Sequence, residues 1–233
     1  MDIQDKVIIV TGASEGIGLA TVKLLNEHGA KLVLAARSEG KLTSAAEGLK
    51  EAMIIATDMR DPEAIKNLIS CVKEKYGRVD VLVNNAGQGM SSPVETIDIE
   101  NYQQIIELNI YGPLRAMQQV IPLMREQGGG TIINISSNVS KNYFPTLAAY
   151  ASTKYALNAL SLTARTELAK DNIIVGVMHP GLTATQFGAN GLRDEKSPRF
   201  DTSAMKADSP EQVAEKIMQA IQTGEAETFM EGY

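Results

Sequence analysis

Short apolar runs alternate with longer amphipathic segments along this whole chain. The runs are rich in β-branched residues and nearly free of polar ones, which is typical of strands buried on both faces. Strands that alternate with helices form a parallel sheet, because each helix carries the chain back to start a parallel neighbour. The pattern therefore predicts an α/β fold, a doubly wound parallel sheet with helices on both faces. The predicted strands are Lys6–Val10, Lys31–Ala35, Met53–Thr57, Val79–Asn84, Thr131–Ser136, Ile173–Met178 and a short one near Glu227–Met230.

The amphipathic segments predict six helices, and two of these have clear start signals. Asp61 and Ser209 each stand before a proline at the first helical position, and Ser209 with Gln212 fits a capping box. The 233 residues suffice for one substantial core, so we predict a single domain over residues 1–233. Residues 179–208 have no clear pattern, and we predict that they form a substrate loop or lid. The predicted helices are Gly18–His28, Lys41–Leu49, Pro62–Tyr76, Ile99–Glu126, Ala148–Lys170 and Pro210–Thr223.

Composition excludes several classes of protein. The net charge is −6 and the basic residues are scattered, which argues against nucleic acid or an anionic membrane as partner. The first residues do not resemble a signal peptide, and no apolar run approaches the roughly 20 residues of a membrane span. The single cysteine, Cys71, fits a reducing compartment, so we expect a cytoplasmic protein. Two histidines and one cysteine make no metal-ligand cluster, and no metal site is expected.

A glycine-rich turn follows the first strand. The residues Thr11–Gly18 read Thr-Gly-Ala-Ser-Glu-Gly-Ile-Gly and lead directly into a helix. Glycines let the backbone approach a pyrophosphate, and the helix N-terminus offers free N–H groups with a positive dipole end. The Gly-x-x-x-Gly-x-Gly spacing differs from the common dinucleotide fingerprint and from a P-loop. It predicts a dinucleotide site, with a tight turn that binds no ligand as the alternative.

The end of the second predicted strand bears on cofactor choice. NAD-binding sites usually place an acid there to hold the ribose hydroxyls. This chain has Arg37 and Ser38 after Ala36, and a guanidinium favours a 2′-phosphate. Glu15 argues the other way, because it is expected near the same ribose. NADP(H) is therefore the predicted cofactor, and NAD(H) stays possible.

Tyr150 and Lys154 are spaced to share one face of a helix. An ammonium beside a phenol favours the phenolate and lowers its pKa, which is about 10 when unperturbed. A tyrosine tuned in this way is a general acid or base near neutral pH.

Taken together, these residues resemble the short-chain dehydrogenase/reductase family over essentially the whole chain. Single motifs are weak, but their order and spacing are together highly specific. The resemblance implies a Rossmann-like fold of about seven parallel strands. It also implies hydride transfer between NADP(H) and a carbonyl compound or secondary alcohol. The matching motifs are Thr11–Gly18, Asp58, Asn84-Asn85-Ala86-Gly87, Asn109, Ser137, Tyr150 with Lys154, and Pro180-Gly181.

The resemblance assigns four catalytic roles. Tyr150 protonates the substrate oxygen, and Lys154 lowers the pKa of Tyr150 and grips the nicotinamide ribose. Ser137, thirteen residues before Tyr150, holds the substrate oxygen. Its neighbour Ser136 is set aside, because side chains alternate along a strand and only one of the two is expected to face the site. Asn109 holds a water that links the lysine to solvent.

Asn109 also has a physical argument of its own. Pro113, four residues later, has no N–H to donate to the Asn109 carbonyl. The helix is therefore expected to kink at this point and free that carbonyl for a water. A kink that serves only packing is the alternative.

The cofactor set also follows from the resemblance. Asp58 is expected at the adenine amino group, Met59 against the ring, and Thr185 at the nicotinamide carboxamide. Asn84, Ala86 and Gly87 are expected to line the cofactor and steady the central strands. The predicted cofactor residues are Gly12, Ser14, Glu15, Gly16, Ile17, Gly18, Arg37, Ser38, Asp58, Met59, Asn85, Ala86, Gly87, Tyr150, Lys154, Pro180, Gly181, Thr183 and Thr185.

The predicted substrate pocket is mostly apolar, which favours a neutral carbonyl compound. His28 and His179 are expected to be structural. Two other functions stay open, a 3-oxoacyl-carrier-protein reductase and a non-catalytic NADP(H) sensor. The family pairs subunits through two long helices, here Ile99–Glu126 and Ala148–Lys170, so we expect a homodimer or homotetramer. The predicted pocket residues are Gln88, Met90, Asn138, Val139, Phe144, Leu147, Phe187 and Leu192.

Overall fold

A parallel sheet of seven strands forms the centre of the protein, in a computed structural model that describes residues 1–193 and 206–230. The strand order is β3-β2-β1-β4-β6-β7-β9, and every neighbouring pair is parallel. The order reverses between β1 and β4, and ligands bind at such switch points in open α/β sheets. The strands are β1 (Val7–Thr11), β2 (Lys31–Ala36), β3 (Ala52–Ala56), β4 (Val81–Asn84), β6 (Gly130–Ile135), β7 (Ile173–His179) and β9 (Glu227–Phe229).

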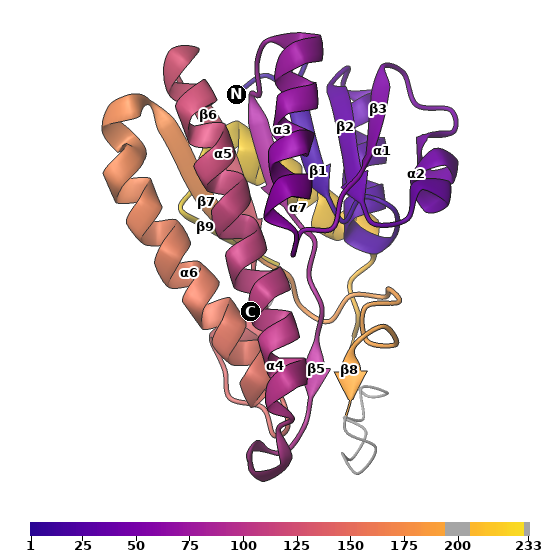
Figure 1. Ribbon diagram of the computed structural model, residues 1–233, viewed down its shortest axis with the longest axis vertical. Coiled ribbons are helices and arrows are strands. Elements are labelled where there is room, and N and C mark those ends of the chain that lie inside the picture. The colour runs from indigo at the N-terminus through magenta and orange to yellow at the C-terminus, as the bar shows by residue number, and fades with distance from the viewer. Residues whose placement is uncertain (194–205, 231–233) are drawn as a thin grey trace.

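Helices cover both faces of the sheet. In Figure 1, α3, α5 and α6 lie in front of the sheet, while α1 and α7 lie behind it. Alternate side chains of β1 pack against the helices on opposite faces of the sheet. Ile8 and Val10 face the α1 and α7 side, and Val7 and Ile9 face the α3 and α5 side. The helices are α1 (Gly16–Glu27), α2 (Glu39–Ala46), α3 (Pro62–Tyr76), α4 (Ile99–Ile106), α5 (Gly112–Glu126), α6 (Ala148–Leu168) and α7 (Pro210–Thr223).

The predicted fold class is confirmed, and so are the capping signals. Asp61 accepts a hydrogen bond from the Glu63 N–H at the start of α3. Ser209 and Gln212 form the expected capping box at the start of α7. The short seventh strand is present as β9, at the edge of the sheet beside β7.

Three predicted segments differ from the structure. The helix predicted at Lys41–Leu49 is α2, which begins earlier because Ser38 caps it and ends before Gly48, where φ is +78°. The single helix predicted at Ile99–Glu126 is α4 and α5 joined by η2 (Glu107–Tyr111), a π-helical turn. The loop predicted at 179–208 contains β8 (Leu192–Arg193), which pairs with β5 (Met90–Ser91) in a separate two-stranded sheet below the main one (Figure 1). Residues 194–205 of that loop lie outside the described part of the chain.

Candidate active site

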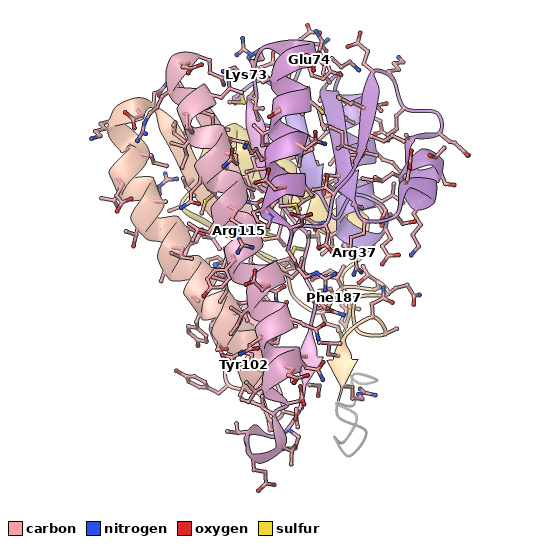
Figure 2. The ribbon with its side chains drawn as sticks, viewed as in Figure 1. Arg37, Lys73, Glu74, Tyr102, Arg115 and Phe187 are labelled. Atoms are coloured by element: carbon pink, nitrogen blue, oxygen red, sulfur yellow. The ribbon has the colours of Figure 1, made fainter. Side chains whose placement is uncertain are left out.

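A cleft of about 630 Å³ opens at the carboxyl ends of the strands, across the switch point between β1 and β4. Its walls come from the glycine-rich turn, the ends of β2, β3, β4, β6 and β7, and α6. In Figure 2, Arg37 and Phe187 both lie below the sheet, toward the loop that carries β8. The predicted residues that line the cleft are Gly12, Ser14, Glu15, Gly16, Ile17, Arg37, Ser38, Asp58, Met59, Asn85, Ala86, Gly87, Gln88, Ser137, Asn138, Val139, Phe144, Leu147, Tyr150, Lys154, Pro180, Gly181, Thr183, Thr185 and Phe187.

The glycine-rich turn is tied to the end of β4. The Thr11 hydroxyl accepts hydrogen bonds from the N–H groups of Asn85 and Ala86, each at 3.0 Å. Gly12 has a φ of +64°, and a Cβ at this position would lie 2.9 Å from the Ala86 Cα. A Cβ on Gly16 would contact Thr185, on the opposite wall, at 3.2 Å. A side chain at Gly12 or Gly16 would press on the neighbouring wall, so the turn fits a dinucleotide backbone lying against these glycines.

Two predicted cofactor residues have packing roles instead. Gly18 does not line the cleft; a Cβ there would overlap the Gly12 carbonyl oxygen, so this glycine lets α1 start against the turn. Asn84 is buried in the sheet, where its amide donates to Asn134 Oδ1 at 2.8 Å. Asn84 therefore steadies the central strands, while Asn85, Ala86 and Gly87 line the cleft.

One end of the cleft carries four charged groups. Arg37 and Lys41 line it together with Glu15 and Asp58. The Glu15 carboxylate accepts from Lys41 Nζ at 2.9 Å and from the Asn190 amide at 2.8 Å. Asp58 is paired with Arg60 at 2.6 Å, and this hydrogen bond holds the pKa of the Asp58 carboxyl below its ordinary value. Glu15 thus already has a cation and an amide as partners.

The other end holds Tyr150 and Lys154, one turn apart on α6 and both buried. Lys154 Nζ lies 5.8 Å from the centre of the Tyr150 ring and donates to the Ile135 carbonyl at 2.8 Å. Burial raises the pKa of Tyr150 well above its ordinary value, and the neighbouring Ser137 side chain opposes this rise. Burial lowers the pKa of Lys154 to about 8. The expectation that Lys154 lowers the pKa of Tyr150 is therefore corrected: burial is the larger effect on both groups.

Ser137 and Ser136 differ in the hydrogen-bond partners of their hydroxyls. Both line the cleft, contrary to the expectation that only one of them faces it. The Ser136 hydroxyl lies 3.3 Å from that of Ser140, whereas the Ser137 hydroxyl accepts from the Val139 N–H at 3.3 Å and opposes the rise in the pKa of Tyr150. Through this bond to Val139, Ser137 caps the short turn η3 (Asn138–Ser140).

Asn109 lies behind the cleft rather than in it. It is fully buried in η2, where its amide exchanges hydrogen bonds of 3.0 and 2.9 Å with the backbone of Gln88 and donates to the Thr153 hydroxyl at 3.1 Å. The predicted break in the helix is confirmed, since the Gly112 N–H bonds to the Glu107 carbonyl, five residues back. Asn109 thereby fastens the loop after β4 to α6, next to Lys154.

Phe187 lies beside Tyr150, with the two ring centres 5.7 Å apart. Gln88 donates from its side chain to the Asn190 carbonyl at 2.8 Å, which connects the loop after β4 with the loop after β7. Two predicted pocket residues do not line the cleft. Met90 is buried in β5 against Ile105 and Ala149, and Leu192 packs on the same cluster, because the pairing of β5 with β8 turns both away.

Sequence reasoning missed part of the lining. Several of these residues adjoin a predicted one at the carboxyl end of a strand. Ligands bind at these ends in open α/β sheets, so sequence position alone could have identified these residues. Lys41 and Asn190 had no such signal, because only the folded chain brings them to Glu15. The missed residues are Ala36, Lys41, Thr57, Leu108, Ile135, Ser136, Leu182, Gln186, Gly188 and Asn190.

Two searches over residues 1–193 and 206–230 bear on other classes of protein. No helix in these ranges has the length and hydropathy needed to cross a bilayer. Within the same ranges, histidine, cysteine and acidic side chains form no group of three that would hold a metal ion.

The doubly wound sheet and the cleft at its switch point define a Rossmann-like dinucleotide-binding protein. A family model described as short chain dehydrogenase matches residues 6–196. An uncharacterized oxidoreductase of Staphylococcus saprophyticus is 36% identical over 234 residues, which cover 99% of this chain and 95% of that relative. The chain therefore belongs to the short-chain dehydrogenase family and is an oxidoreductase that uses a nicotinamide cofactor.

Solved structures with similar folds include two with known activities. The L-sorbose reductase of Gluconobacter frateurii, in complex with NADPH and L-sorbose, is 30% identical, with a TM-score of 0.87 over 100% of this chain and 98% of that one. The 3-ketoacyl-(acyl-carrier-protein) reductase of Brucella melitensis, in complex with NADH, is 25% identical, with a TM-score of 0.87 over 95% of this chain and 93% of that one. These two relatives thus bind different nicotinamide cofactors.

Proposed function

We propose that this protein transfers a hydride between NADP(H) and a neutral carbonyl compound or secondary alcohol. The observation that carries the proposal is that buried Tyr150 lines one cleft with Ser137 and Lys154, and that the same cleft has the glycine-rich turn in its wall. A substrate oxygen bound between the Tyr150 and Ser137 hydroxyls would accept a hydrogen bond from each. When bound, the nicotinamide supplies or accepts the hydride.

The protein's own groups would handle the proton. Tyr150 is held in its neutral form by burial, so it is ready to donate a proton to the oxygen of a carbonyl group under reduction. Ser137 holds that oxygen in place. Lys154, whose pKa burial lowers to about 8, exchanges protons near neutral pH and would resupply Tyr150 while binding the nicotinamide ribose. Asn109 keeps the loop after β4 and α6 in register beside it.

NADP(H) is the proposed cofactor because of the charges at the adenosine end. Arg37 and Lys41 both line the cleft there, and guanidinium and ammonium groups bind phosphate strongly. Glu15, the residue that argued for NAD(H), is already bound to Lys41 and Asn190. A 2′-phosphate would draw Lys41 toward itself and leave Glu15 with the Asn190 amide.

The proposed substrate class is neutral. The described lining near Tyr150 is formed by Val139, Phe144, Leu147 and Phe187, with amides from Gln88 and Asn138. No described arginine lines this end of the cleft, so no guanidinium there would grip a substrate carboxylate. A dicarboxylate as the best substrate would contradict this proposal.

The test is oxidation of NADPH and of NADH against a panel of ketones, aldehydes and β-keto esters, with Tyr150→Phe in parallel. We expect turnover with NADPH that falls by about 10²-fold or more in Tyr150→Phe, since the variant keeps the ring but has no proton to donate. Binding of NADPH with no turnover in the wild type would favour the sensor alternative. Undiminished turnover in Tyr150→Phe would show that another group donates the proton.

A reductase of carrier-bound substrates is the second candidate, favoured by the similarity to the Brucella enzyme. To distinguish the two candidate functions, kcat/KM is compared for a carrier-bound acetoacetyl group and for the free β-keto ester. A much higher kcat/KM for the carrier-bound form would establish this candidate.

We also propose that the protein is a homodimer or homotetramer that pairs through α5 and α6. Tyr155 of α6 is 38% exposed and stacks at 6.3 Å on Tyr143, which is 92% exposed, so aromatic surface is available on this side. Light scattering of the purified protein tests this, and a monomer at micromolar concentration would contradict it.

A further inference from the structure

His179 is a buried titratable residue directly next to the cleft. It ends β7, is 1% exposed, and precedes Pro180 and Gly181, which line the cleft. Its ring lies parallel to that of Phe229, with an angle of 5° and centres 4.5 Å apart. Its Nε2 is 3.0 Å from Glu227 Oε1. Glu227 and Phe229 belong to β9, so the edge strand of the sheet holds this imidazole from one side.

The other side of the ring faces the turn that carries Ser137. Nδ1 lies 3.4 Å from the Ser137 carbonyl oxygen and 3.4 Å from the Ser140 hydroxyl. Ser140 donates to the same carbonyl at 2.6 Å and accepts from the Asn158 amide at 2.9 Å. His179 therefore packs directly behind the backbone that presents the Ser137 hydroxyl to the substrate.

Two charged groups face His179, Glu227 on β9 and Lys141 after η3, and they bind each other at 2.7 Å. A carboxylate oxygen only accepts hydrogen bonds, so the neutral ring carries its proton on Nε2 and leaves a lone pair on Nδ1. Burial lowers the pKa of His179, although the Ser137 carbonyl and Glu227 both oppose this shift. The ring is therefore neutral at pH 7.

Protonation would change what the ring does to the turn. A second N–H would appear on Nδ1, aimed at the Ser137 carbonyl and the Ser140 hydroxyl. It would compete with Ser140 for that carbonyl, and a charged donor makes the stronger hydrogen bond. The backbone of Ser137 would then shift toward β9, away from Tyr150.

We propose that His179 is a positioning residue for Ser137: the neutral ring, held by Glu227 and Phe229, packs behind the Ser137–Ser140 turn without donating a hydrogen bond to it, and protonation disturbs the turn. This inference rests on the proposed function, since it needs Ser137 to hold the substrate oxygen. It gives the edge strand β9 a part in the reaction, although no residue of β9 lines the cleft.

The pH profile of kcat tests the proposal, and the chain offers a matched control because it has only two histidines. His28 is exposed at the end of α1, where its Nδ1 lies 2.9 Å from the Leu24 carbonyl. With NADPH and the best carbonyl compound of the panel, wild-type kcat is expected to fall on the acid side, below the ordinary histidine pKa of about 6.5. His28→Gln should keep this profile.

Three variants separate positioning from a purely structural role. His179→Leu should lower kcat about tenfold while the NADPH Kd stays within about twofold, because a misplaced Ser137 affects chemistry more than cofactor binding. His179→Gln, whose amide reaches Glu227, should recover part of that loss and abolish the acid limb. Glu227→Gln should move the acid limb to lower pH, since it removes the carboxylate that favours the charged ring and frees the Lys141 ammonium that opposes it.

An unchanged acid limb in both His179→Gln and Glu227→Gln would overturn the proposal, and these two decide the matter if His179→Leu does not fold. Loss of NADPH binding in step with kcat would also overturn it, since that is the result of a merely structural role. Tyr150→Phe, measured in the same series, distinguishes failure of the proposed function from failure of the inference about His179. If it stays active the proposed function is wrong, whereas an inactive Tyr150→Phe beside unaffected histidine variants refutes this inference alone.

Discussion

At the scale of the residue, burial rather than spacing has the larger effect on the pKa values of Tyr150 and Lys154. Tyr150 and Lys154 share a face of α6 as the i, i+4 spacing predicts, but both are buried, and they line the cleft with the end of β6 and the loop after β7. Removing a charge from water is costly, so burial moves both pKa values toward the neutral forms. The spacing in the sequence predicted that Tyr150 and Lys154 are neighbours. How deeply they are buried depends on the tertiary structure packed around them.

Lys154→Met is therefore expected to raise the melting temperature at pH 7 while it abolishes turnover. The folded-state pKa of Lys154, about 8, lies below its ordinary value of 10.5, so the folded chain binds fewer protons than the unfolded one between these values. The free energy of unfolding of the wild type should therefore rise as the pH rises through this range. The difference in free energy of unfolding between Lys154→Met and the wild type should become smaller. Melting curves from pH 7 to 10.5 test this. Lys23→Met, at an exposed position on α1, is the control. A variant less stable than the wild type at every pH would contradict the prediction.

At the scale of the element, the π turn η2 matters because it changes where α5 begins. The extra residue in the turn brings Gly112 against the loop after β3, where a Cβ would lie 2.7 Å from the Met59 carbonyl oxygen. Met59 lines the cleft, so the start of α5 supports this part of the cleft wall from behind. Pro113 predicted a break in this helix, but proline alone does not distinguish a π turn from a simple kink.

Two glycines at helical positions give a matched prediction. Gly112→Ala should destabilise the fold by about 1–3 kcal/mol, because its methyl group overlaps backbone, and should raise the KM for the cofactor. Gly40→Ala should stabilise it by about 0.5–1 kcal/mol, because Gly40 lies in α2 with no atom within 4 Å of the added methyl group. Urea unfolding measures both. Equal effects of the two substitutions would show that helix propensity, rather than contact with Met59, governs position 112.

At the scale of the whole molecule, the cleft joins the two halves of the sheet. Its lining comes from β1 and β2 on one side of the switch point and from β4, β6 and β7 on the other. A ligand that contacts both halves stabilises them together and should shift the whole melting transition. The size of that shift measures cofactor affinity independently of turnover.

NADPH at about 100 times its Kd should add about 2.7 kcal/mol, which is about 5–10 °C for a chain of this size. Arg37→Gln with Lys41→Gln should reduce the shift with NADPH and leave the shift with NADH nearly unchanged, because only NADPH carries the 2′-phosphate. Lys23→Gln is the control for a lysine outside the cleft. A larger shift with NADH than with NADPH in the wild type would reverse the proposed cofactor preference.

Most of the fold was predictable because its signals are local. Strand and helix positions follow from apolar periodicity, and Asp61 and Ser209 mark helix starts through bonds to residues two or three positions away. β5 and β8 carried no such signal, since each is two residues long and exists only through pairing with the other. Met90 was misassigned for that reason.

The sequence by itself determined the order of the elements, the glycine-rich turn and the spacing that puts Tyr150 and Lys154 on one helix face. These properties depend on near neighbours along the chain. Only the tertiary structure decided which pKa values burial shifts, that Lys41 and Asn190 share Glu15, and that His179 of β7 joins β9 to the Ser137 turn. These depend on solvent exclusion and on contacts between residues tens to more than a hundred positions apart, which form only when the packed sheet brings distant loops to one edge.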